Sequence, residues 1–324
     1  MRVDKKTNRK FFVFFLIICF LSIINVIAFD VILNLSRDNL HYNNFYQELK
    51  EGSSFGHSYI RYENLTGAKE PFFFIFMYFF ASLGVDYSTA ILVMNILLSA
   101  VLALSVAKAN LKNQALIFIL FYLSTDYYLF VLFSEAHRLK LGVVFLLVSF
   151  LIVRKNTFRY YFSLLIMSLS HFQTSILAYF SVARLSFLRV IVVTLFFAVL
   201  FSIFSGIVLD KISYYFAIND VVESVSSTGF LIVLFLLLNV VVLKVRNGKY
   251  IAFLFFLLFL SAMLGKMRIN IIVFELSMFY LFLGVDGLRK KDLPPYFLVG
   301  FFVFSTAIFN IFKIFVQYTH LMEI

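Results

Sequence analysis

The chain has 324 residues, of which 62% are hydrophobic and 20% aromatic, and it carries a formal net charge of +11 at pH 7. Soluble domains are about 45–50% apolar, so this composition excludes an ordinary soluble domain and predicts a polytopic membrane protein. The 28 lysines and arginines are scattered in short clusters between apolar runs. This pattern is typical of membrane-topology signals and excludes a nucleic-acid-binding patch.

The first apolar run covers residues 11–32 and follows the basic sequence MRVDKKTNRK. The pattern resembles a signal peptide, but the run is long enough to span a membrane and no small-x-small cleavage site follows it. We therefore expect a retained helix with its N-terminus in the cytoplasm. Cys19, the single cysteine, lies in this run, so no intrachain disulfide can form.

Ten further apolar runs follow, at residues 71–84, 87–107, 115–133, 139–153, 158–182, 187–209, 229–244, 250–265, 269–285 and 296–316. Most of them approach the ~20 residues that a helix needs to cross the hydrocarbon core. Unpaired backbone is not tolerated in lipid, and the runs are not alternating ten-residue strands. We predict an all-α, polytopic integral membrane helical bundle of about 9–11 transmembrane helices. We expect residues 1–324 to form a single membrane domain.

Two of these segments are unusual as simple spans. The run 71–84 is short for a crossing and is typical of a re-entrant or tilted half-helix. The run 158–182 carries several polar residues at its centre, including His171 and Gln173, which favours a broken helix whose backbone lines a cavity.

Lysine and arginine accumulate on the cytoplasmic side of membrane proteins, and this rule favours one topology. If 71–84 and 158–182 both enter and leave on one side, the cytoplasmic share of the 28 cations is larger than if every run crosses. The polar segment 33–70 is then an outer or periplasmic loop, and its mixed charge and many tyrosines indicate an ordered cap. Residues 210–228 are a second outer loop.

Several polar groups in or beside the apolar runs are candidates for chemistry. Arg138 has a planar fork that matches phosphate oxygens, although a lone arginine at a helix end often serves as an interfacial anchor. His137 and Lys140 lie beside it and favour anion binding, so both interpretations stay open. Asp126, inside an apolar run, needs a partner that the sequence does not reveal.

His171 and Glu70 each admit two interpretations. His171 is either a hydrogen-bonded core histidine or a group that holds a diphosphate oxygen or transfers a proton. Glu70 directly precedes Pro71, so it is either part of a helix start or a general base at a membrane mouth. The chain contains no Walker motif, HExxH, CxxC or GxSxG. We expect no metal and no cofactor.

Taken in order, these features resemble the EpsG family of Wzy-type polysaccharide polymerases. The resemblance rests on Asp38, Tyr42 and Tyr46 after the first helix, Glu70-Pro71 opening a helix, Arg138 starting a later helix, a cationic loop before a helix that ends in His171-Phe172-Gln173-Thr174, and a late Arg268. It covers most of the chain. One departure is that Leu139-Lys140-Leu141-Gly142 follows Arg138, where the family has a Gln-Gly-Leu-Ala-like run, so a role for that glutamine is not carried over.

The resemblance implies a membrane glycosyltransferase of the bacterial inner membrane. It would transfer an O-antigen, capsule or exopolysaccharide glycan from undecaprenyl diphosphate to the end of another lipid-linked repeat unit on the periplasmic or outer face. The implied catalytic residues are Glu70, Arg138 and His171, and the implied substrate-binding residues are Asp38, Tyr42, Tyr46, His137, Lys140, Gln173 and Arg268. The implied partners are undecaprenyl-diphosphate-linked oligosaccharides, membrane lipid, a flippase and a chain-length regulator.

Two other functions are compatible with cations in a membrane cavity. The first is a lipid-linked oligosaccharide flippase or another envelope-glycan transporter, which would favour an internal repeat, and no repeat is visible. The second is an acyltransferase that acts on envelope sugars, which would place a histidine and an acid on a cytoplasmic or midplane face.

The favoured topology makes a prediction about cysteine accessibility in intact cells. In a chain whose Cys19 is replaced, a cysteine at Gly56 should react with a membrane-impermeant thiol reagent, whereas one at Thr157 should be protected. Strong labelling at residue 157 from outside would overturn the re-entrant topology.

Overall fold

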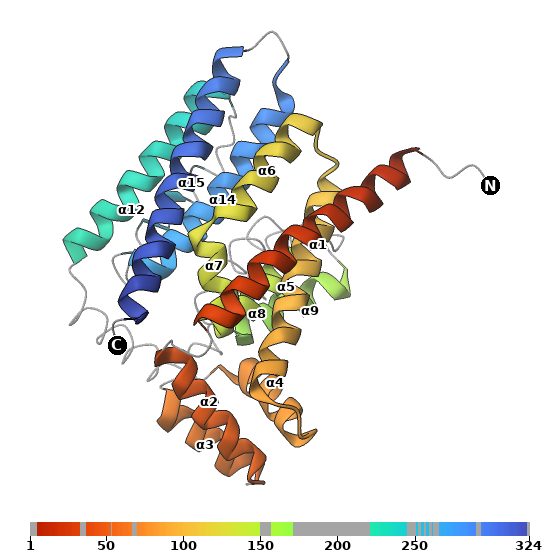
Figure 1. The fold of residues 1–324 in the computed structure, drawn as a ribbon, viewed down its shortest axis with the longest axis vertical. Coiled ribbons are helices and arrows are strands. Elements are labelled where there is room, and N and C mark those ends of the chain that lie inside the picture. Colours follow the sequence, from red (N-terminus) through yellow and green to blue (C-terminus); the bar gives the residue numbers. More distant parts are fainter. Residues whose placement is uncertain are drawn as a thin grey trace, which may run out of the picture. The chain divides into compact units, whose positions relative to one another are not determined.

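The structure is a computed structural model that describes residues 5–32, 37–52, 54–66, 70–149, 157–170, 221–244, 251, 254–255, 257–258, 261, 266–289 and 293–322. These residues form helices and no strands (Figure 1). The helices are α1 (Lys5–Ile32), α2 (Arg37–Lys50), α3 (Phe55–Thr66), α4 (Pro71–Ser82), α5 (Tyr87–Ala109), α6 (Asn113–Thr125), α7 (Tyr127–Ser134), α8 (His137–Leu147), α9 (Phe158–Ser170), α12 (Val221–Leu236), the π-helix η2 (Leu237–Val242), α14 (Lys266–Gly287) and α15 (Leu293–Met322).

The predicted all-α membrane bundle is confirmed. Three helical stretches in the described part of the chain are long and apolar enough to cross a membrane, namely Thr7–Ala28, Tyr87–Ala109 and Pro294–Val316. A bent helix pair, α6 with α7, is a fourth candidate. The total of 9–11 transmembrane helices stays a prediction, because several of the apolar runs fall outside the described residues.

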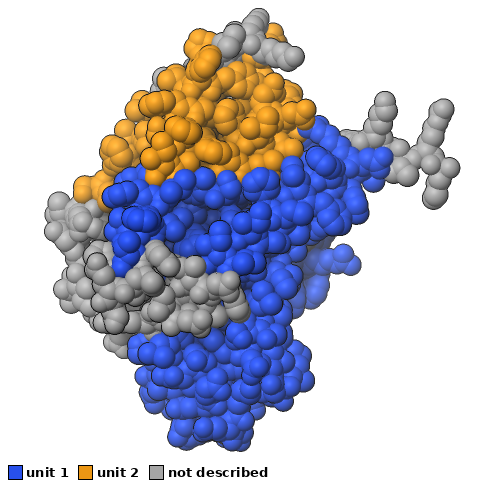
Figure 2. Space-filling view, in the orientation of Figure 1, with its two compact units in different colours: residues 1–110, 123–182, 309–324 blue, residues 111–122, 183–308 orange. Residues whose placement is uncertain are grey.

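The chain divides into two compact units, which Figure 2 shows in different colours. Unit 1 comprises residues 1–110, 123–182 and 309–324, and unit 2 comprises residues 111–122 and 183–308. The prediction of a single membrane domain stays a prediction. Within unit 2, α12 packs against α14, and a buried hydrogen bond of 2.7 Å from Thr228 to Asn270 joins the two helices.

Helix α1 shows why an apolar sequence folds here as a membrane helix. Its buried residues recur every three or four positions, on the face that packs against α5: Val13, Ile17, Leu21, Ile24 and Ala28. Phenylalanines and aliphatic residues also cover the exposed positions of α1, among them Phe11 and Ile23. A helix that is apolar on all sides, with only one side packed against protein, suits a lipid environment.

The segment 33–70, predicted to be an ordered cap, contains two helices. Helices α2 and α3 pack against each other and against α4. The apolar residues of α2 lie at intervals of three and four, which buries one face of the helix: Tyr42, Phe45, Tyr46 and Leu49. These side chains join Tyr62 of α3, and Phe73, Phe74 and Met77 of α4, in one aromatic-rich core. The outer location of this segment stays a prediction.

Helix α4 begins at Pro71, the position at which the sequence predicts a helix start. Proline is favoured there because the first backbone N–H groups of a helix have no intrahelical acceptor. The helix has 12 residues and is therefore ~18 Å long at 1.5 Å per residue, too short to cross the bilayer. It ends in a tight turn in which Gly84 has a φ of +71°, a conformation that glycine adopts without strain.

The run 115–133, predicted as one span, is broken at Asp126. Helices α6 and α7 are bent by 52° at this residue. The Asp126 side chain accepts hydrogen bonds from the backbone N–H groups of Tyr128 (3.0 Å) and Leu129 (3.2 Å). These N–H groups belong to the first turn of α7, where the backbone offers them no intrahelical acceptor. The partner of Asp126 that the sequence does not reveal is therefore the backbone at the start of α7.

Two other predicted segments are only partly described. The first half of the run 158–182 forms α9, which ends at Ser170, and His171 and Gln173 lie outside the described residues. Of the predicted loop 210–228, residues 221–228 form the start of α12, and residues 210–220 lie outside the described part of the chain.

The cap at Asp126 makes a prediction about stability. Asp126→Ala should lower the free energy of unfolding by about 1 kcal/mol, because two backbone donors lose their acceptor. The measurement is the thermal unfolding midpoint of the purified protein in detergent. Asp86→Ala is the control: Asp86 also precedes a helix, α5, but makes no side-chain cap hydrogen bond. This variant loses only an exposed ion pair with Lys50, and such pairs contribute less than about 1 kcal/mol. Equal midpoints for the two variants would contradict the capping role of Asp126.

Candidate functional site

Two of the predicted catalytic residues meet in unit 1. Glu70 precedes α4, Arg138 lies in the first turn of α8, and the two are 68 positions apart in the sequence. Arg138 Nη1 donates a hydrogen bond of 2.9 Å to Glu70 Oε2. The exposed fraction of the side chain is 1% for Glu70 and 15% for Arg138. A charge-assisted pair that is almost completely removed from water is thus centred at the N-termini of two helices.

The Glu70 carboxylate does not cap α4. Glu70 is the N-cap residue of that helix by position, but its side chain makes no cap hydrogen bond. It points instead to the Arg138 guanidinium. The helix-start interpretation therefore explains Pro71, whereas the carboxylate is engaged in the ion pair.

Two tyrosines of the aromatic core complete the surroundings of the pair. The guanidinium of Arg138 lies 5.7 Å from the centroid of the Tyr42 ring, a cation–π contact. Tyr62 is fully buried, and its hydroxyl has no hydrogen-bond partner among the residues that the structure describes. Burial raises the pKa of Tyr62 well above its usual value, and the Glu70 carboxylate raises it further. Tyr62 is therefore a neutral phenol at physiological pH, able to donate a hydrogen bond.

His137 and Lys140 lie in a polar network of buried side chains. Both side chains are fully buried. The Lys140 ammonium contacts three acceptors: Asn95 Oδ1, the Phe133 carbonyl at 3.0 Å and His137 Nδ1 at 3.1 Å. An ammonium has three donors, so all of them are used. The substrate-binding role predicted for these two residues stays a prediction.

The network also fixes the tautomer of His137. A lysine ammonium only donates, so His137 Nδ1 accepts, and the ring proton lies on Nε2. Nε2 contacts Asn39 Oδ1, and Asn39 Nδ2 donates to the Ser134 carbonyl at 2.9 Å. At the other end of the network, Asn95 Nδ2 donates to Asn25 Oδ1 at 2.6 Å. The chain of bonds connects α1, α5, α8 and α2, and so anchors the α2 cap to the apolar helices.

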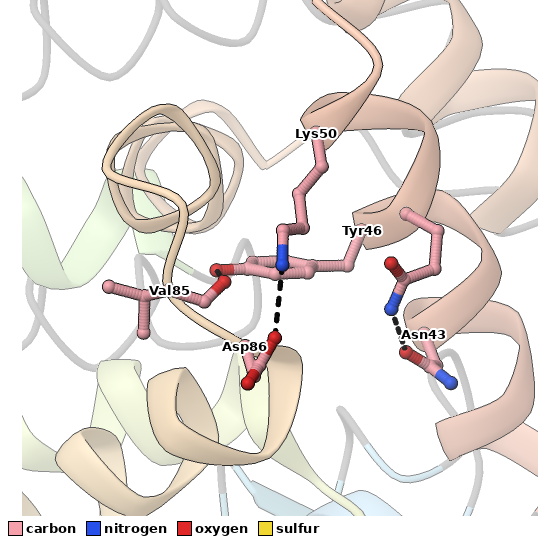
Figure 3. A network of polar contacts seen from close by, with 6 residues as sticks. Asn43, Tyr46, Lys50, Val85 and Asp86 are labelled. Atoms are coloured by element: carbon pink, nitrogen blue, oxygen red, sulfur yellow. Dashed lines mark hydrogen bonds and ion pairs between the residues drawn. The ribbon is translucent and has the colours of Figure 1, made fainter.

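A second set of contacts anchors α2 to the turn between α4 and α5, as Figure 3 shows. The Tyr46 hydroxyl donates a 2.9 Å hydrogen bond to the Val85 carbonyl, and Lys50 forms a 3.0 Å ion pair with Asp86. Burial, together with the Asp86 carboxylate, raises the pKa of Tyr46 to about 12. The stability that this pKa shift contributes is present below the usual tyrosine pKa of about 10 and is lost as the pH rises towards 12.

The described contacts do not test the other predicted site residues. Asp38 lies in the first turn of α2, in unit 1. Arg268 lies in the first turn of α14, in unit 2. His171 and Gln173 lie outside the described residues. The roles predicted for all four stay predictions. Within the described residues, no group of three or more His, Cys, Asp or Glu side chains is placed to hold a metal ion.

Three structural residues of this region were not predicted. Tyr62 lies beside the ion pair, and Asn39 and Asn95 bind His137 and Lys140. A sequence signal exists for Asn39, because Asn39, Asn43 and Gln47 recur every four positions along α2. No local signal exists for Tyr62 or Asn95, whose partners are distant in the sequence.

Comparison of the chain with protein-family models, with curated proteins and with solved structures finds no match.

The Tyr62 hydroxyl, which has no partner among the described residues, makes a prediction. Tyr62→Phe should leave the thermal unfolding midpoint unchanged or raise it, because it removes a buried donor that forms no bond with any of those residues. Tyr46→Phe is the matched control and should lower the free energy of unfolding by about 1 kcal/mol, because it removes the bond to Val85. A loss of stability in Tyr62→Phe equal to that in Tyr46→Phe would mean that the Tyr62 hydroxyl has a partner in the folded protein.

Proposed function

We propose that this membrane protein is a Wzy-type glycosyltransferase that polymerises lipid-linked glycan repeat units. Its donor is a glycan on undecaprenyl diphosphate, and its acceptor is the terminal sugar of another lipid-linked unit, on the outer face of a bacterial inner membrane. The observation that carries the proposal is the buried Glu70–Arg138 pair. The reaction needs a cation for the leaving diphosphate and a base for the attacking hydroxyl, and the pair contains one of each.

Arg138 suits the role of diphosphate ligand. Within the described part of the chain, Glu70 is its only hydrogen-bond partner, through one of the five N–H donors of a guanidinium. The remaining donors can form a bidentate contact with phosphate oxygens. The Tyr42 ring and Glu70 hold the guanidinium in place, and the neutral Tyr62 phenol is a further donor for the same oxygens.

Glu70 suits the role of general base. A diphosphate that binds Arg138 weakens the ion pair, which increases the basicity of the carboxylate. The acceptor hydroxyl then attacks the anomeric carbon of the donor and forms the new C–O bond, while its proton passes to Glu70. The bond between the anomeric carbon and the diphosphate oxygen breaks, and its electron pair leaves with the diphosphate. Arg138 stabilises the charge that develops on the leaving oxygen.

The environment of the pair suits lipid-linked substrates. Helix α4 is too short to cross the membrane, which suits a site near the boundary between lipid and water. Exposed aromatic and aliphatic side chains on α1 supply apolar surface for prenyl chains. The implied protein partners are a flippase that supplies the lipid-linked units and a chain-length regulator.

The first test is Arg138→Lys. An ammonium keeps the charge but loses the planar fork, so polymer formation should fall roughly a hundredfold while the protein stays in the membrane. Polymer length is read from a gel ladder, with membrane abundance as the control. Arg61→Lys is the matched control, because it makes the same substitution in another ion pair. Arg61 pairs with the partly exposed Glu48 at the same distance, 2.9 Å.

A wild-type ladder for both Arg138→Lys and Arg138→Ala would remove Arg138 from the site.

A deletion strain separates the polymerase from the flippase alternative. Single repeat units should accumulate on the outer leaflet, and accumulation on the cytoplasmic leaflet would support a flippase instead.

The second test separates catalysis from structure at Glu70. Glu70→Gln should abolish polymer, but it also leaves a buried guanidinium without its counter-charge, which typically costs 3–5 kcal/mol. The double variant Glu70→Gln with Arg138→Met removes both charges and should recover the thermal unfolding midpoint. Polymer should stay absent in the double variant. A restored ladder would show that the pair is structural only.

A further inference from the structure

A polar cleft lies on unit 1 between α2 and the start of α5. It has a volume of about 310 Å³. Helix α2 contributes Asn39, Asn43 and Gln47, which lie at intervals of four along one face. Asp86, Tyr87 and Ser88 line the opposite wall. This face of α2 is distinct from the face that carries the aromatic core, so one helix both packs the cap and forms the cleft.

We propose that this cleft binds a sugar unit of the glycan substrate. The choice of a sugar over another neutral polar ligand rests on the proposed function. The cleft itself, and the class of group that it accepts, follow from its lining.

The lining is mostly uncharged and rich in groups that both donate and accept. Side-chain amides and hydroxyls do both, which matches the hydroxyl groups of a sugar. The Asp86 carboxylate is the one charged group among the lining residues, and its counter-charge is the Lys50 ammonium at 3.0 Å (Figure 3). A cleft with no excess of cations disfavours phosphate and favours an uncharged polyol.

The lining is also held in place before a ligand arrives. Gln47 donates a hydrogen bond of 3.1 Å to Asn43. Asn39 is buried at the floor of the cleft, where it contacts His137, Tyr87 and the Ser134 carbonyl. Preorganised polar groups bind with a smaller loss of conformational entropy. Leu40, which is 59% exposed, lines the same cleft and offers an apolar contact for the C–H face of a sugar ring.

The cleft is connected to the ion pair through bonds of the structure. Asn39 at its floor contacts His137, and His137 is the neighbour of Arg138 in the first turn of α8. A sugar in the cleft and a diphosphate at Arg138 would therefore be held by adjacent parts of α2 and α8. This arrangement suits a glycan that extends from its diphosphate along the cap.

The experiment measures sugar binding directly. The probe is the repeat-unit oligosaccharide released by mild acid from the lipid-linked glycans of the cell that makes the protein. Binding to the purified full-length protein is followed by saturation-transfer NMR in lauryldimethylamine oxide, because maltoside detergents present competing sugar head groups. We expect binding to the wild-type protein and at least tenfold weaker binding to the double variant Asn43→Ala with Gln47→Ala.

The matched control is Asn44→Ala, an exposed amide of α2 outside the cleft, which should bind like the wild type. Equal binding by the double variant, or no binding by the wild type, would overturn the proposal. Arg138→Lys separates this proposal from the proposed reaction, because it should lose polymer and keep sugar binding. A normal ladder for Arg138→Lys, with binding that still depends on Asn43 and Gln47, would reject the role of Arg138 and leave the sugar site standing.

Discussion

The positively charged start of α8 constrains the architecture of unit 1. Two cations there, Arg138 and Lys140, are removed from water inside an apolar protein. A buried cation without a partner costs several kcal/mol, so each must find acceptors on other helices. Glu70 supplies one, and Asn95 supplies another. The packing of the cap, α4 and α5 around α8 follows from this requirement.

The two ways of satisfying these cations have different chemical consequences. Lys140 has all its donors occupied by neutral acceptors, so it stabilises the junction of the helices that this network connects and has no donor left for a ligand. Within the described residues, Arg138 has a single charged partner and a planar fork whose other donors form no hydrogen bond with those residues. A buried ion pair is weak support for stability, since apolar residues of similar volume often do as well. This difference makes Arg138, and not Lys140, the better candidate for a ligand contact.

Helix α2 has two faces with separate roles. Its aromatic face packs against α3 and α4 and brings Tyr42 over the guanidinium and Tyr62 beside the ion pair. Its amide face lines the polar cleft. Because a helix is rigid, the position of one face fixes the position of the other. Two contacts fix the position of α2: the Asn39–His137 contact at one end of the helix and the Tyr46–Val85 hydrogen bond towards the other.

The sequence alone determined the features that depend on local composition and on short-range backbone rules. Hydropathy over long runs predicted the helical membrane bundle, because no other backbone arrangement satisfies these apolar segments in lipid. Pro71 predicted the start of α4, because proline removes an N–H that the helix does not use. The cost of a charge among apolar residues singled out Glu70, Arg138 and Asp126.

Only the tertiary structure decided which partner each polar group has. Glu70 and Arg138 are separated by 68 positions, and Lys140 and Asn95 by 45, so no spacing rule connects them. The sequence grouped His137 and Lys140 with Arg138, whereas the folded chain joins them to asparagines of other helices. Asp126 shows the opposite case, because its acceptors serve the turn directly after it. Hydrogen bonds between residues close in the sequence follow local rules such as helix capping, which can be recognised from the sequence. Contacts between helices depend on how the whole unit packs.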